Sequence, residues 1–217
     1  MLVHTFDSSL SEAEWRDWVM NGPKFGLLAI AGANASQAPD LIPTHFTLRE
    51  DEIWLHLARE NRASAALRAG NAASLSIFGD YAYVPNQWRA RPDTPAETGV
   101  PTSYYAAVNF VLEPTVVDSP VELVEILEAQ MQDMQPEGGY AAITADGGAY
   151  SHMLSAIFGV KFAIKSVEAK FKYDDHKSTD FRQRIAERLF NRNSHSDAGA
   201  ATQQQRRLDE IGDWSSR

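Results

Sequence analysis

Four polar residues in a row, Arg59, Glu60, Asn61 and Arg62, are the stretch of this sequence whose residue types best suit ligand binding. They follow an apolar run and precede helix-forming residues 63–69, so Asn61 is placed as an N-cap and Gly70 as the left-handed residue after the helix. A helix N-terminus carries partial positive charge, and guanidinium groups there are unfavourable unless an anion shares the site. The residue types predict a phosphate shared by the pair Arg59 and Arg62 at the helix start, or alternatively a solvated arginine pair on a loop.

Two histidines are predicted to face each other across a hairpin. Residues 49–52 are charged and suit a short turn, in which case the numbers of paired residues sum to about 101 and His45 lies opposite His56. The pair could bind a metal, form a polar patch against a ligand, or be a chance surface pair. Metal is the least favoured because no third ligand stands at suitable spacing. The apolar alternation Ile53, Leu55, Leu57 belongs to the core, so the histidine face is expected to line the ligand pocket.

The amino-acid composition limits the classes of protein to which this chain can belong. The 217 residues are 44% hydrophobic and 10% aromatic, enough for a packed core, and 20 Lys and Arg against 29 Asp and Glu give a net charge of −9. That charge argues against attraction of the whole surface to nucleic acid or anionic membrane. The absence of cysteine excludes disulfides and thiolate chemistry. With no signal peptide pattern and no run of membrane-spanning length, we expect a cytoplasmic protein.

The order of predicted elements favours a mostly β protein with added helices, of the α+β class. A capping box at Ser11 and Glu14 opens the first helix. Residues 41–48 alternate as a strand in which Pro43 demands an edge or a bulge. Further strands are expected near residues 25–31, 104–117 and 160–173 and on either side of the short helix within residues 53–84, and further helices near residues 120–134, 153–157 and 178–190. This order predicts an antiparallel barrel over residues 1–190, followed by a polar tail, residues 191–217.

Several segments in this order resemble the PaiB family of FMN-binding negative transcriptional regulators. The resemblance covers residues 1–190. Its motifs are Ile42-Pro43-Thr44-His45-Phe46, Leu55-His56-Leu57-Ala58-Arg59-Glu60-Asn61, Phe78-Gly79-Asp80-Tyr81-Ala82-Tyr83-Val84 through Trp88, Val100-Pro101-Thr102 and Glu168-Ala169-Lys170-Phe171-Lys172. One departure is Thr102-Ser103-Tyr104-Tyr105, where the family commonly reads Thr-Trp-Asn-Tyr.

The resemblance implies an antiparallel split β-barrel, related to the pyridoxamine-phosphate oxidases, that binds FMN as a homodimer. A strand backbone would line the flavin ring, and basic residues after the third strand would hold the phosphate. Independently, a flavin needs cations, backbone N–H groups and aromatic cover. Tyr83 and Trp88 could supply that cover, although packing in the core is the favoured alternative for both. The expected cofactor-binding residues are Pro43, Thr44, His45, Phe46, His56, Ala58, Asn61, Arg62, Tyr83, Trp88, Lys170 and Lys172.

Three functions compete. The first is an FMN-binding homodimer with a regulatory role, the second is a flavin-dependent oxidoreductase acting on a small substrate, and the third is a DNA-binding repressor. Residues 161–192 hold nine Lys and Arg against five Asp and Glu, which could contact phosphate but is more often a solvated face. No helix-turn-helix signature, nucleophile elbow or metal-ligand spacing is found, so no catalytic residue or metal ligand is predicted.

Overall fold

The computed structural model describes residues 1–32, 34, 36–146 and 148–214 of the chain. Its strands form a seven-stranded sheet in the order β2-β1-β5-β6-β7-β4-β3. Contacts divide the chain into two compact units. The terminal unit comprises residues 1–15, 78–108 and 168–217, and the central unit comprises residues 16–77 and 109–167. The expected α+β class with an antiparallel sheet is confirmed.

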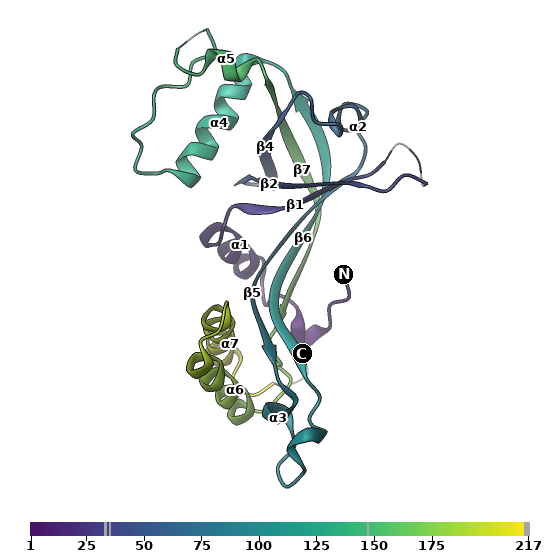
Figure 1. The fold of residues 1–217 in the computed structure, drawn as a ribbon, viewed down its shortest axis with the longest axis vertical. Helices are drawn as coiled ribbons and strands as arrows, with labels where there is room; N and C mark the ends of the chain where they lie inside the picture. The colour runs from purple at the N-terminus through teal and green to yellow at the C-terminus, as the bar shows by residue number, and fades with distance from the viewer. Residues whose placement is uncertain (33, 35, 147, 215–217) are drawn as a thin grey trace. The chain divides into compact units, whose positions relative to one another are not determined.

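The elements follow the predicted order with revised bounds (Figure 1). The strands are β1 Phe25–Ile30, β2 Asp40–His45, β3 Thr47–Arg49, β4 Glu52–Ala58, β5 Ala73–Val84, β6 Thr102–Val117 and β7 Ile157–Lys172. The helices are α1 Glu12–Asn21, α2 Ser64–Arg68, α3 Asn86–Arg89, α4 Pro120–Met134, α5 Ser151–Leu154, α6 Thr179–Arg192 and α7 Asp197–Ile211, with 3-10 turns η1 Thr5–Asp7 and η2 Ala96–Thr98.

The predicted strand over residues 41–48 is two strands in the central unit. β2 pairs with β1 and β3 pairs with β4, and these two pairs lie at opposite ends of the sheet order. The chain changes partner at Phe46, whose amide donates to the Lys24 carbonyl at 3.0 Å. Pro43 lies on β2, an edge strand of the sheet, as predicted.

The β3–β4 hairpin has the predicted register. Thr47 lies opposite Trp54 and Arg49 opposite Glu52, so paired residue numbers sum to 101. Ile53, Leu55 and Leu57 are 0%, 0% and 6% exposed and form part of the core, as the alternation required.

Helix α4 packs against the other face of β4 in the central unit (Figure 1). β4 pairs with β7, and Gly159 of β7 lies opposite His56. A Cβ atom built at Gly159 would come within 2.5 Å of the Ile126 side chain of α4. The glycine therefore leaves the room that α4 needs to lie close to the sheet.

The start of α1 follows the predicted capping box in part. The Ser11 hydroxyl accepts a hydrogen bond from the Glu14 amide at 3.2 Å. The Glu14 carboxylate accepts from the Leu10 amide at 2.6 Å, and it also accepts from Arg206 and Arg207 of α7. The same carboxylate thus caps the start of α1 and anchors α7.

The predicted polar tail is wrong for residues 197–211, which form α7 and pack on α6 in the terminal unit (Figure 1). Arg207 is fully buried and donates to Asp175 at 2.7 Å and to Glu14 at 2.5 Å. Arg182 of α6, also fully buried, donates to Asp175 at 3.2 Å. The face of α7 that packs inward therefore combines small apolar residues with a buried, paired arginine, which low apolar content does not reveal. Residues 215–217 of the predicted tail lie outside the described residues.

No helix within the described ranges is long and apolar enough to cross a membrane.

Replacing Arg207 with alanine should destabilise the fold by about 3–5 kcal/mol, because it leaves the buried Glu14 and Asp175 carboxylates short of their partner. Urea unfolding followed by circular dichroism measures this loss. The matched control is Thr202→Ala at an exposed position of the same helix, which should cost no more than about 0.5 kcal/mol. Equal stabilities of the two variants would contradict the role given to Arg207.

Candidate functional site

The connection between β4 and α2 in the central unit is fixed by Asn61. Its side-chain Oδ1 accepts from the Ala63 amide at 3.0 Å, and its carbonyl accepts from the Ser64 amide at 2.9 Å. Gly70 follows the helix at φ +74°, the left-handed conformation that glycine tolerates. The predicted short helix is confirmed, although Asn61 caps the turn before α2 and not the helix itself.

Three arginines around this connection face carboxylates. Arg59 and Arg68 both donate to Asp118, at 2.8 Å and 2.5 Å. The hydrogen bonds from Arg68 and then Arg59 hold the pKa of Asp118 well below its ordinary value. The Nε of Arg62 lies 2.5 Å from Oδ1 of Asp40. The predicted conflict between cations and the helix start is therefore relieved by carboxylates of this chain.

Arg62 nevertheless has donors to offer a phosphate. Its side chain is 81% exposed, and its closest contact with Asp40 is through Nε. A guanidinium group has five N–H donors in a planar fork, and the four on its terminal nitrogens meet no acceptor among the described residues. With Glu60 in the same turn, the local charges balance, so recognition of an anion here would depend on directed hydrogen bonds and not on net charge. A phosphate fits this donor set, beside or in place of Asp40.

The predicted contact of the two histidines on one face is confirmed, although His45 ends β2 and is paired with Phe25 of β1 and not with His56. The rings of His45 and His56 lie 5.7 Å apart between centroids, edge to face. Loss of hydration lowers the pKa of His45, and the neighbouring charge on His56 lowers it further. Two imidazoles in contact on one face disfavour the doubly protonated state.

A buried glutamine of α4 orients His56. Nδ1 of His56 lies 2.7 Å from Oε1 of Gln130, whose side chain is almost fully buried. Because an amide oxygen only accepts, Nδ1 carries the proton in this arrangement and Nε2 is the acceptor. Gln130 Nε2 and the hydroxyl of Thr47 are buried without a hydrogen-bond partner among the described residues. Such orphaned groups suit an acceptor that the chain does not supply, such as an ordered water or a ligand carbonyl.

The other residues predicted for the flavin ring lie on β2, on β4 or at the point where β2 ends. Pro43 and Ala58 are exposed, Thr44 is 8% exposed, and Phe46 is fully buried. Ala58 is the last residue of β4, and Asn61 and Arg62 follow it in the β4–α2 connection.

The remaining predicted site residues belong to the terminal unit. Lys170 is buried and donates to the Leu2 carbonyl at 2.7 Å, and Lys172 donates to Thr102 at 3.0 Å. Trp88 packs beneath two guanidinium groups, at 4.7 Å from Arg192 and 5.8 Å from Arg188.

Tyr83 is 49% exposed and Trp88 is half-buried, so neither side chain lies in the core. The part that Tyr83, Trp88 and the two lysines play in flavin binding stays a prediction.

One cavity, in the terminal unit, was not predicted. It has a volume of about 630 Å³ and lies between the loop after α3 and helix α6. The only signals in the sequence were the length of that loop and the positive charge of residues 161–192.

Comparison with known proteins places the chain in a family. The sequence model described as "Putative FMN-binding domain" matches residues 4–166, three quarters of the chain. The protein therefore belongs to this FMN-binding family, and the β4–α2 connection and the histidine pair lie within the matched region. Family membership supports a flavin as cofactor. No curated protein matches the chain in sequence.

Solved structures show the same fold at low sequence identity. A FAD and heme binding protein from Mycobacterium smegmatis has a TM-score of 0.55 and 15% identity over 76% of this chain and 73% of its own. A flavocytochrome from Azotobacter vinelandii has a TM-score of 0.55 and 13% identity over the same shares. A conserved hypothetical protein from Mycobacterium tuberculosis has a TM-score of 0.53 and 17% identity over 79% and 90%. The predicted split-barrel fold is confirmed.

The lowered pKa of His45 predicts a pH-dependent stability. The folded state binds fewer protons than the unfolded chain below about pH 6.5, so the free energy of unfolding should fall as pH drops through this range. His45→Gln should remove that part of the dependence, as measured by urea unfolding between about pH 7.5 and 5.5. His152→Gln, an exposed histidine of α5, is the control. If His45→Gln kept the full pH dependence of the parent protein, His45 would not be its source.

Proposed function

We propose that this protein binds FMN and that its central unit holds the phosphate at the β4–α2 connection. The observation that carries the proposal is Arg62, an exposed guanidinium with four unused N–H donors, at the turn fixed by Asn61 inside the region matched by the family. A bound flavin would supply transfer of hydride or single electrons. The protein supplies the positioning.

Each residue has a separate task in this proposal. Arg62 donates to the phosphate, and Asn61 keeps the turn in the conformation that presents it. The backbone of residues 43–46 would lie along the ring. His56, oriented by Gln130, would keep Nε2 as a hydrogen-bond acceptor. His45 stays neutral near pH 7 because its pKa is lowered, so it need bring no positive charge to the ring.

The PaiB type, with a regulatory role, is the form of this function that the sequence motifs favour. Direct DNA binding has weaker support. Among the cations of residues 161–192, six are bonded to carboxylates, a carbonyl or a hydroxyl of the chain: Lys161, Lys165, Lys170, Lys172, Arg182 and Arg192. Groups already engaged in this way are poor phosphate contacts. We therefore propose that any regulatory output follows from flavin binding.

A homodimer is part of the proposal. In the terminal unit, Phe78, Tyr81 and Tyr83 of β5 are 72%, 51% and 49% exposed. Aromatic side chains left open on a strand are typical of an interface. A second copy of this chain is the occupant expected from the PaiB resemblance.

Arg62→Ala should weaken FMN binding by about 1.5–3 kcal/mol, the contribution of a hydrogen bond to a charged group. Isothermal titration calorimetry with FMN measures the change. Asp40→Asn is the matched variant, because it releases Nε of Arg62 and should leave binding as strong or stronger. Equal affinity of Arg62→Ala and the parent protein would remove Arg62 from the phosphate site.

Light scattering at micromolar concentration should give twice the mass of the 24.1 kDa chain when FMN is present. Tyr81→Glu and Phe78→Glu should shift that mass toward one chain if β5 forms the interface, because each places a charge in an apolar contact. A parent protein of monomeric mass would contradict the homodimer.

A further inference from the structure

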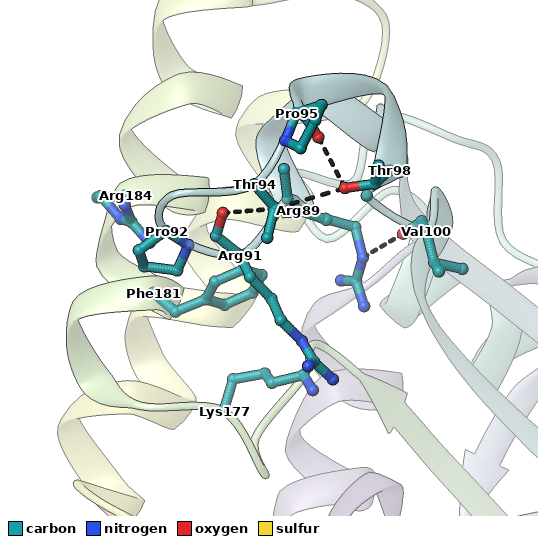
Figure 2. A pocket seen from close by; sticks show the side chains of 12 residues that line it. Arg89, Arg91, Pro92, Thr94, Pro95, Thr98, Val100, Lys177, Phe181 and Arg184 are labelled. Carbon is teal, nitrogen blue, oxygen red and sulfur yellow. Dashed lines mark hydrogen bonds between the residues drawn. The ribbon is translucent and has the colours of Figure 1, made fainter.

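The cavity in the terminal unit has walls of two kinds. Loop residues that follow α3 form one side, and Lys177, Phe181 and Arg184 of the α6 region form the other (Figure 2). At about 630 Å³ it is in the size range of small-molecule sites. Pro92, Pro95 and Val100 make part of the lining apolar.

The loop side of the cavity is held in place by the chain itself. Arg89 donates from Nε to the Val100 carbonyl at 2.7 Å and forms an ion pair with Asp174, a buried residue. Gly99 approaches α3 so closely that a Cβ there would come within 1.9 Å of the Asn86 carbonyl oxygen. Thr98 donates to the Pro95 carbonyl at 2.7 Å, as Figure 2 shows. The wall is therefore formed before any ligand arrives.

Three cations of the cavity have no acidic partner. Arg91, Lys177 and Arg184 form no ion pair with a carboxylate anywhere in the part of the chain that the structure describes, whereas Arg89 is neutralised by Asp174. No Asp or Glu is among the lining residues. In a chain of net charge −9, such a group of unpaired cations is a local exception.

The aromatic ring among these cations adds a second feature. Phe181 lines the cavity, with Arg89 at 5.7 Å and Arg184 at 6.0 Å from its ring centroid. In the view of Figure 2, Arg91 and Lys177 extend to one side of this ring and Arg184 to the other. A planar ligand ring could stack on Phe181 or on a guanidinium plane while its charged group reaches the cations.

We infer that this cavity binds a planar organic anion, with a phosphate monoester on an aromatic ring as the chemical class. A phosphate monoester carries nearly two negative charges at pH 7 and several acceptor oxygens, which suits three unpaired cations. The concave, partly apolar lining favours a small molecule over a nucleic acid duplex. This inference stands apart from the flavin proposal, because none of its residues belongs to the β4–α2 connection.

Adenosine monophosphate is the probe, titrated calorimetrically into the full chain. It should bind more tightly than either adenosine or inorganic phosphate, and its affinity should fall as salt is raised. Arg91→Ala, Lys177→Ala and Arg184→Ala should each weaken it roughly tenfold, the loss of one charge-assisted hydrogen bond. Arg188→Ala is the matched control: it lies one turn along the same helix, contacts Trp88 and does not line the cavity.

Three results would overturn the inference. The first is that adenosine monophosphate does not bind. The second is that inorganic phosphate binds as tightly as adenosine monophosphate does. The third is that Arg184→Ala and Arg188→Ala weaken binding of adenosine monophosphate equally. Arg62→Ala separates this site from the flavin site, because it should bind adenosine monophosphate as the parent does. Failure of the cavity variants to weaken binding therefore leaves the flavin proposal standing, and failure of FMN to bind leaves this one standing.

Discussion

The register of the β3–β4 hairpin is the constraint on which the central unit depends. Side chains alternate along a strand, so a slip of one residue in β4 would move Ile53, Leu55 and Leu57 out of the core and bring His56 into it. With the observed pairing, the apolar set is buried and the histidines meet on the opposite face, where Gln130 of α4 orients one of them. The same strand leads directly into the turn that presents Arg62.

In the terminal unit, buried ion pairs are packed within the apolar core. Arg182 and Arg207 are fully buried, and Asp175 lies between them. Tyr104, in the segment that departs from the PaiB motif, donates to Asp174 at 2.9 Å, and burial raises the pKa of its phenol above the usual range. Arg89 pairs with that same aspartate. These ion pairs and hydrogen bonds hold α6 and the loop beside the cavity in place. Arg91, Lys177 and Arg184 take no part in them and are available to a ligand.

Features of the fold that depend on neighbouring residues could be predicted from local sequence patterns. The hairpin register follows from turn length and apolar alternation, and the start of α6 at Ser178 follows from its side-chain cap. The change of partner at Phe46 could not be predicted, because the alternation continues through it and the choice between β1 and β4 is not local. Helix α7 was missed because a buried Arg207 looks polar in sequence. At the site, the turn at Asn61 could be predicted from the sequence. The ion pair between Arg62 and Asp40 could not, because it joins segments that are distant in the sequence.

The central claim, that this chain carries a flavin, is tested most directly by the visible absorption spectrum of the purified protein. The account predicts the two flavin bands in the near ultraviolet and blue, and release of FMN when the protein is denatured, in a ratio approaching one per chain. A colourless protein that also fails to take up added FMN would contradict it.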